Sequence, residues 1–279
     1  IAASIWMRLL ANVATIGVAA FLVHDNARPA LQESELSLLS STWKRLRAVA
    51  AMPLPWSLIL LCIVTRMALI AVVFAVLGTF AAMMISSYGE SHEDATMVSA
   101  LTNIGFSSIA LTISLLLYFR RSFAERLDSR ALVLFAILVK ASGLLALYPW
   151  TPFAVPMASF NASTGIGCDP SKYAWCLDGA APPRTLYPIV VAITFGFAWV
   201  PGTMALDTIY SKLLVGIDQN IMQGAIMLAE DATTICTPFA ASTIFQYYGL
   251  KSISLVSSGF LFANGVVWLY FMPRMKAFL

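Results

Sequence analysis

The sequence has little charge for a protein of its length. Only 11% of its 279 residues are Asp, Glu, Lys or Arg, whereas 59% belong to the hydrophobic and aromatic types. A soluble domain carries roughly 25% charged residues, because its surface has to face water. The composition therefore excludes a soluble enzyme and a disordered chain. It predicts a helical protein whose side chains are surrounded mostly by lipid.

The sequence also lacks the motifs of most enzymes and cofactor-binding proteins. It contains no cluster with metal-ligand spacing, no nucleophile triad and no phosphate-binding loop, and Gly165-Ile166-Gly167 is a loop fragment, not a nucleotide motif. Four cysteines are too few for a disulfide framework. The net charge of +3 is dispersed between apolar segments. We therefore expect no enzymatic activity, no cofactor, no metal and no nucleic-acid partner.

Long apolar runs are what the sequence contains instead. A transmembrane helix needs about 20 mostly apolar residues. Seven candidate segments run over about 1–23, 58–86, 97–119, 131–150, 186–209, 222–247 and 252–272. The 222–247 segment is the weakest, because it contains Glu230 and Asp231. The pattern predicts an all-α polytopic membrane protein with about seven transmembrane helices.

The basic residues predict which connections face the cytosol. Most of the 17 Lys and Arg residues fall in the 24–57, 120–130 and 210–221 connections and in the C-terminal tail. Because cytosolic loops carry an excess of Lys and Arg, these segments and the C-terminus are expected in the cytosol. The acidic 87–96 loop and the long 151–185 loop then face the opposite side.

The 151–185 loop carries two features of an extracytosolic segment. Cys168 and Cys176 lie close together in a Gly- and Pro-rich stretch, so they are candidates for a disulfide in an oxidising compartment. Two unrelated thiols are the alternative. Asn161 begins an Asn-Ala-Ser glycosylation sequon, which is a weak signal because such sequons are common by chance.

The order of the spans separates two classes of membrane protein. Seven helices match a G-protein-coupled receptor in topology, but the third span ends Tyr118-Phe119-Arg120-Arg121 and lacks the acidic-Arg-Tyr triplet of those receptors. A long cytosolic linker, 24–57, instead separates the 1–23 helix from a six-helix block, 58–279. Six-helix halves joined by such a linker are the plan of the major facilitator superfamily. On this plan 1–23 is helix six, and the N-terminal half is missing from a chain that begins at Ile1.

Several stretches after the fourth predicted span carry a family resemblance. They are Gly167-Cys168-Asp169-Pro170 with Tyr173-Ala174-Trp175-Cys176, Trp199-Val200-Pro201-Gly202, the run from Thr208 to Leu214, and Gln223-Gly224 with Pro238. They resemble the lysosomal, ceroid-lipofuscinosis-related branch of the major facilitator superfamily. The resemblance implies helix six plus a C-terminal six-helix bundle, a paired-Cys lumenal segment, a helix break at Pro201-Gly202 and a lysosomal address. The sequence departs at Thr234, where the family carries Arg.

Charged and polar residues inside the spans are the candidate functional groups, because such charges are costly in lipid. Glu230, Thr234 and Thr237 follow helical spacing and form one polar stripe, with Asp231 on a neighbouring face. A carboxylate there is a candidate proton carrier, or else a structural hydrogen-bonding group. Further candidates are Asn103 as a cavity-lining residue, Asp207 as a contact of Lys212 or Arg130, and Lys140 as one partner of an ion pair. Arg66 is assigned to the cytosolic boundary of its span and is not a site candidate.

The sequence thus predicts a secondary active transporter of the major facilitator type. It would move a small solute across a lysosomal or other internal membrane, coupled to a proton or ion gradient, with lipid as its surroundings. A complete pathway requires the missing half or a second chain. The alternative is a membrane protein without transport activity, either a seven-helix receptor or a truncated scaffold.

Overall fold

The computed structural model describes residues 54–120, 127–177, 179–214 and 219–276 of the chain. They belong to a compact unit, Leu54–Leu279, and all of the following refers to it. The predicted first span, 1–23, and almost all of the predicted linker, 24–57, lie outside the described residues.

The described residues form five helices that are long and apolar enough to cross a membrane. They are α3 (Trp56–Tyr88), α4 (His92–Phe119), α6 (Ser129–Ala146), α7 (Leu186–Leu213) and α8 (Gln219–Met275). The longest, α8, comprises two helices that meet at Gly249. The helices thus follow the six predicted segments of the 58–279 block in order. The prediction of a helical chain whose helices are long and apolar enough to cross a membrane is confirmed for this part.

Local capping residues explain where the first two helices meet. Gly89 ends α3 in the left-handed conformation, with φ of 70°, where glycine is favoured. Ser91 then caps α4 by accepting a hydrogen bond from the Asp94 amide, and Glu93 and Asp94 lie in the first turn. The segment 87–96 was expected to be a loop. It is a tight turn instead, because these acidic residues favour a helix N-terminus.

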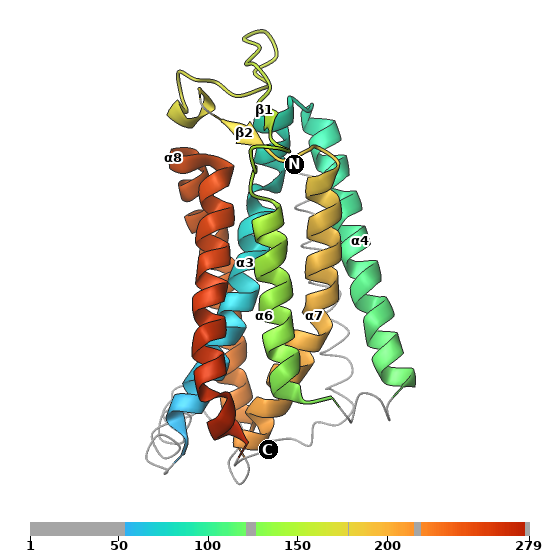
Figure 1. The fold of residues 1–279 in the computed structure, drawn as a ribbon, viewed down its shortest axis with the longest axis vertical. Coiled ribbons are helices and arrows are strands. Elements are labelled where there is room, and N and C mark those ends of the chain that lie inside the picture. Colours follow the sequence, from blue (N-terminus) through green and yellow to red (C-terminus); the bar gives the residue numbers. More distant parts are fainter. Residues whose placement is uncertain (1–53, 121–126, 178, 215–218, 277–279) are drawn as a thin grey trace, which may run out of the picture. The chain divides into compact units, whose positions relative to one another are not determined.

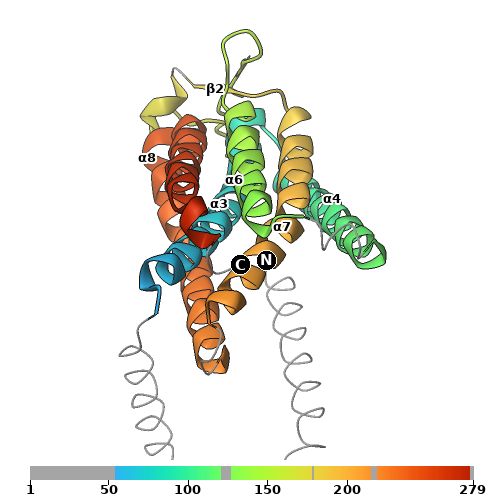
Figure 2. The same cartoon turned by 60° about the horizontal axis from the view of Figure 1, so that its bottom comes forward.

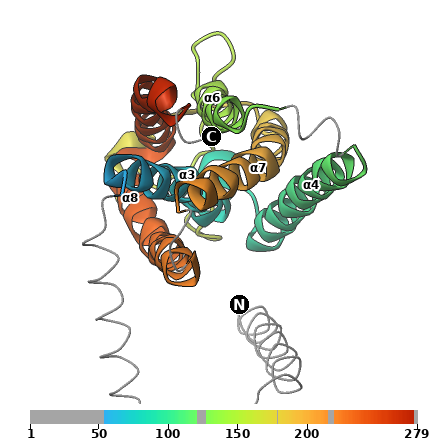
Figure 3. The ribbon, with the colours of Figure 1, turned by 90° about the horizontal axis from the view of Figure 1, so that it is seen from below.

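The helices pack around α3, as the three ribbon views show together (Figures 1, 2 and 3). α3 lies against α8, while α6 lies between α8 and α7. α4 packs mainly on α7 and stands at the edge of the unit. Most side chains of α4 are exposed, whereas α3 has buried residues spread from Leu58 to Ser87. The core therefore follows α3 and the faces of α6, α7 and α8 that turn toward it.

The long segment between α6 and α7 folds into a small cap at one end of the helices (Figure 1). Within it, β1 (Val155–Pro156) pairs antiparallel with β2 (Ala180–Ala181), and the short 3-10 helix η1 spans Ala174–Cys176. A disulfide joins Cys168 to Cys176. Residue Arg120, at the end of α4, lies at the opposite end of the unit.

The structure corrects the expected break at Pro201-Gly202. α7 is helical from Leu186 to Leu213 and passes through both residues. A proline inside a helix lacks the N–H group for one helical hydrogen bond. The helix is bent there but can continue where the turns on both sides keep their hydrogen bonds. Gly202 lies against α6, because a Cβ added there would come within 2.7 Å of the Ala136 Cβ. The pair thus serves close packing of two helices and leaves the helix unbroken.

Candidate functional site

A cluster of three charged side chains joins α3, α7 and α8. The Arg66 Nε donates to Glu230 Oε2 at 3.0 Å, and one terminal nitrogen lies 3.3 Å from Asp207 Oδ1. The same nitrogen lies 3.5 Å from the Thr203 carbonyl oxygen. One guanidinium therefore connects two carboxylates that are contributed by different helices.

Helix positions place this cluster away from the helix ends. Arg66 lies ten residues after Trp56, where α3 begins, which is about 15 Å along the axis. Asp207 precedes the end of α7 at Leu213 by six residues, or about 9 Å. Glu230 lies eleven residues into α8 from Gln219. The cluster sits between helices, not in a surface loop.

The surroundings of the cluster are partly dry. The Arg66 side chain is 14% exposed, that of Glu230 26% and that of Asp207 44%. An ion pair in a low-dielectric setting is stabilised only when every charge has a partner. Here two carboxylates share one guanidinium, so the ionised cluster carries one excess negative charge. Binding one proton, or one monovalent cation, makes it neutral.

A second polar contact lies beside Arg66. The buried Asn264 side-chain amide nitrogen donates to the Thr65 hydroxyl at 3.2 Å, which ties the last part of α8 to α3. The Asn264 Oδ1 atom is buried, and no donor among the described residues forms a hydrogen bond with it. An unpaired buried carbonyl oxygen is costly and is a group to which a donor can bind.

The structure separates the two acidic candidates of the 222–247 segment. Glu230 turns toward Arg66, whereas the neighbouring Asp231 is exposed and forms no ion pair with any described residue. Thr234 donates to the Glu230 carbonyl oxygen at 3.0 Å within its own helix. Thr237 lines a small cavity between α3 and α8. The predicted stripe thus faces inward at Glu230, and Asp231 points out of the unit.

The expectation for Asp207 is wrong, and the one for Asn103 stays a prediction. Asp207 was expected to contact Lys212 or Arg130, but its partner is Arg66, because Asp207 lies on the face of α7 that meets α3. Arg130 pairs with Asp128, which caps the start of α6. Asn103 is half-buried on α4 and shares no hydrogen bond with the cluster, so its cavity-lining role stays a prediction.

Lys140 was expected to form an ion pair, and the structure corrects this. Its side chain is 1% exposed, and its Nζ atom donates to the Leu69 carbonyl oxygen at 3.0 Å. It also lies 5.1 Å from the centroid of the Trp199 ring, a cation–π arrangement. Lys140 thus ties α6 to α3 and α7 through a carbonyl and an aromatic ring. No carboxylate of the described residues pairs with it.

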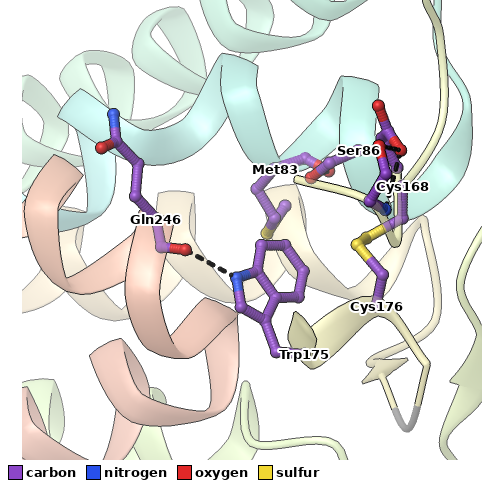
Figure 4. Close-up of a disulfide and its surroundings, with 8 residues drawn as sticks. Met83, Ser86, Cys168, Trp175, Cys176 and Gln246 are labelled. Carbon is purple, nitrogen blue, oxygen red and sulfur yellow. Dashed lines mark hydrogen bonds between the residues drawn. A yellow bond between two sulfur atoms is a disulfide. The ribbon is translucent and has the colours of Figure 1, made fainter. Parts of the chain in front are cut away.

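The residues of the cap lie as a group at the other end of the helices. The disulfide between Cys168 and Cys176 closes a short loop that contains η1 (Figure 4). Asn161 is exposed, and its side-chain oxygen accepts hydrogen bonds from the amide and hydroxyl of Ser163. The sequon is therefore at an accessible turn, and its glycosylation stays a prediction.

Sequence reasoning missed Arg66 as a site residue. It was assigned to the membrane boundary, because the apolar run becomes continuous only at Met67. The buried positions of this segment recur with helical spacing, and this spacing puts Arg66 on the inward face. That pattern could have identified Arg66 as a site residue. Among the described residues, no three His, Cys, Asp or Glu side chains come together as a metal site.

Comparison with known proteins adds no family. No protein-family model matches this chain, and no match was found among curated proteins or solved structures. The resemblance to the major facilitator superfamily therefore rests on the sequence stretches named above.

Proposed function

We propose that this chain is part of a secondary active transporter that couples solute movement to a proton gradient. The observation that carries the proposal is the Arg66–Asp207–Glu230 cluster, in which two carboxylates from two helices share one guanidinium. Charged residues inside apolar helices are costly, and they commonly mark ion or substrate pathways.

The charge balance of the cluster suggests how coupling would work. With both carboxylates ionised the cluster has one excess negative charge, which opposes its enclosure in a dry environment. One bound proton gives a neutral cluster and frees Arg66 to pair with a single carboxylate. The contact between α3 and α8 or that between α3 and α7 then weakens. During the conformational change the cluster is enclosed away from water, and only the protonated, neutral cluster would be enclosed at low cost. Proton binding is thereby linked to helix movement.

A transport pathway also needs a second wall. α4 exposes most of its side chains, including large apolar ones at Met97, Leu101 and Leu111. Lipid can cover apolar faces of this kind, and so can a second bundle of helices. On the major facilitator plan we infer that a second helical unit, either another half or a second chain, faces this one. The family resemblance supports a lysosomal or other internal membrane as the location of this complex.

A pH step on reconstituted protein tests the proposal without knowledge of the solute. Proteoliposomes that contain the full chain are adsorbed to a solid-supported membrane, and the transient current after a pH step is recorded. We expect the wild-type chain to give a charge displacement from proton binding. Glu230→Gln and Asp207→Asn should each abolish it, because each leaves a neutral cluster that needs no proton.

Asp231→Asn is the matched control. It removes a carboxylate from the adjacent position of the same helix, but that carboxylate is exposed and lies outside the cluster. Its current should equal that of the wild type. Full current in Glu230→Gln would contradict the coupling role. Absence of any current in the wild type would favour the alternative, a membrane protein without transport activity.

A further inference from the structure

The two helical parts of α8 meet at a single non-helical residue. Gly249 has φ of 72° and ψ of −170°, whereas the chain is helical on both sides of it. Residues with a side chain rarely adopt this backbone conformation, so glycine is favoured at this position. We name the two parts the first arm, residues 219–248, and the second arm, residues 250–275. Gly249 forms the hinge between them.

The two arms of this hinge and α3 line a common cavity. A cavity of about 230 Å³ lies between them and α3. Ala75 of α3, Ala241 and Ile244 of the first arm, and Ile253 and Phe260 of the second arm are among its lining residues. The cavity is open on one side, so it is a groove between the arms. The arms therefore have space into which they can close.

Trp175 of the cap is seated on the hinge from the outside. Its indole nitrogen donates to the Gln246 carbonyl oxygen at 3.0 Å, and its ring makes an edge-on contact with Phe245, with 5.3 Å between centroids. A Cβ added at Gly249 would come within 2.8 Å of the same ring. Carbonyl groups in the last turn of a helix lack helical partners. The indole thus satisfies a group that the kink leaves free (Figure 4).

The disulfide fixes Trp175 in this place. Trp175 lies in η1 next to Cys176, which is bonded to Cys168. The Cys168 amide donates to the Ala158 carbonyl oxygen, and the Ala158 amide donates to the Ser87 carbonyl oxygen at the end of α3. A chain of covalent and hydrogen bonds therefore runs from α3 to the indole on the hinge.

We propose that Trp175, held by the Cys168–Cys176 disulfide, is a clamp that limits the movement of the two arms of α8 about Gly249. Release of the clamp lets the arms close into the cavity between them. Because the first arm carries Glu230, the clamp restrains the helix that bears one carboxylate of the charged cluster. The inference concerns movement of the arms and stands whether or not the chain transports a solute.

Distance measurements between spin labels test the clamp directly. The labels are attached by thioether bonds at Leu228→Cys on the first arm and Val266→Cys on the second, both of which are exposed positions. Cys236 is exposed and is replaced by alanine, while Cys62 is buried. The protein is folded and reconstituted in nanodiscs with the disulfide intact. A phosphine then reduces the disulfide to two thiols and is itself converted to its oxide, with the added oxygen taken from water.

We expect a narrow distance distribution before reduction, and a broader one with shorter distances after it. Trp175→Ala should give the broad distribution with the disulfide intact. Trp150→Ala is the matched control, because Trp150 lies in the same connection but donates to Leu145 near the end of α6. Its distribution should match that of the wild type. An unchanged distribution after reduction or in Trp175→Ala, or an equal change in Trp150→Ala, would overturn the clamp.

Discussion

At the scale of single residues, two enclosed basic side chains have partners of different kinds. Arg66 faces two carboxylates, whereas Lys140 has a carbonyl oxygen and an indole ring as partners. Removing one member of a buried ion pair leaves the other uncompensated, but replacing a buried charge by a well-packed apolar group is often neutral or stabilising. The two side chains should therefore respond oppositely to the same substitution.

We expect Arg66→Met to lower the free energy of unfolding by about 2 kcal/mol, a value discounted for the partial exposure of Glu230 and Asp207. Lys140→Met should leave stability unchanged or raise it, since the Leu69 carbonyl keeps its partner within α3. Thermal unfolding of the two variants in the same detergent measures the difference. An equal loss in Lys140→Met would show that its carbonyl and indole contacts stabilise the bundle.

Local sequence patterns identified Glu230 but not its partner. A carboxylate inside an apolar run is visible to any count of charges along the chain. The contacts of Arg66 with Asp207 and Glu230 span 141 and 164 residues of sequence, so no local pattern encodes them. The partner of Lys140 is a backbone carbonyl, which every residue carries and which no sequence pattern marks.

At the scale of helices, hydropathy predicted the six segments of the 58–279 block because a helix in lipid must be apolar along its length. The start of α4 at His92 was missed because the rule counts apolar residues, whereas helix caps favour polar and acidic ones. α7 continues through Pro201, and Gly202 packs closely on α6. That contact is tertiary, so no local pattern encodes it.

The cap has a titratable group that should set its stability in acid. Hydrogen bonds from the Ser171 hydroxyl and amide hold the pKa of the Asp169 carboxyl below its usual range, with Lys172 nearby. A carboxyl with a lowered pKa in the folded state stabilises above the pKa of the unfolded chain. That stabilisation is lost as pH falls through the folded-state pKa.

We therefore expect the wild type to unfold at a higher temperature than Asp169→Asn at pH 7 and also at pH 5. The gap should shrink only below the ordinary aspartate pKa of about 3.9. Thermal unfolding of both proteins across this pH range is the measurement. A gap that stays constant down to pH 3 would show that the hydrogen bonds from Ser171 do not depend on the ionised carboxylate.

At the scale of the whole unit, the two ends of the bundle differ in chemistry. The cap, with its disulfide and the sequon at Asn161, lies at one end, and the basic end of α4 at Arg120 lies at the other (Figure 1). Disulfides persist in oxidising compartments, and basic residues gather on the cytosolic side. The two ends therefore offer positions at which the orientation predicted from loop charges can be tested, and that orientation stays a prediction.

Labelling across a sealed membrane tests this orientation. The sharpest test is at α6, the shortest of the five long helices of the described residues. Arg120 and Phe153 are exposed and are separated along the chain by α6, a helix long and apolar enough to cross a membrane. α6 has 18 residues, so it is about 27 Å long and barely matches a hydrocarbon core of about 30 Å. In sealed vesicles of one orientation, with Cys236→Ala as background, an impermeant maleimide should reach Arg120→Cys or Phe153→Cys but never both. Reaction of both variants from the same face would mean that α6 does not cross the bilayer, and the assignment of the cap and of Arg120 to opposite sides would be wrong.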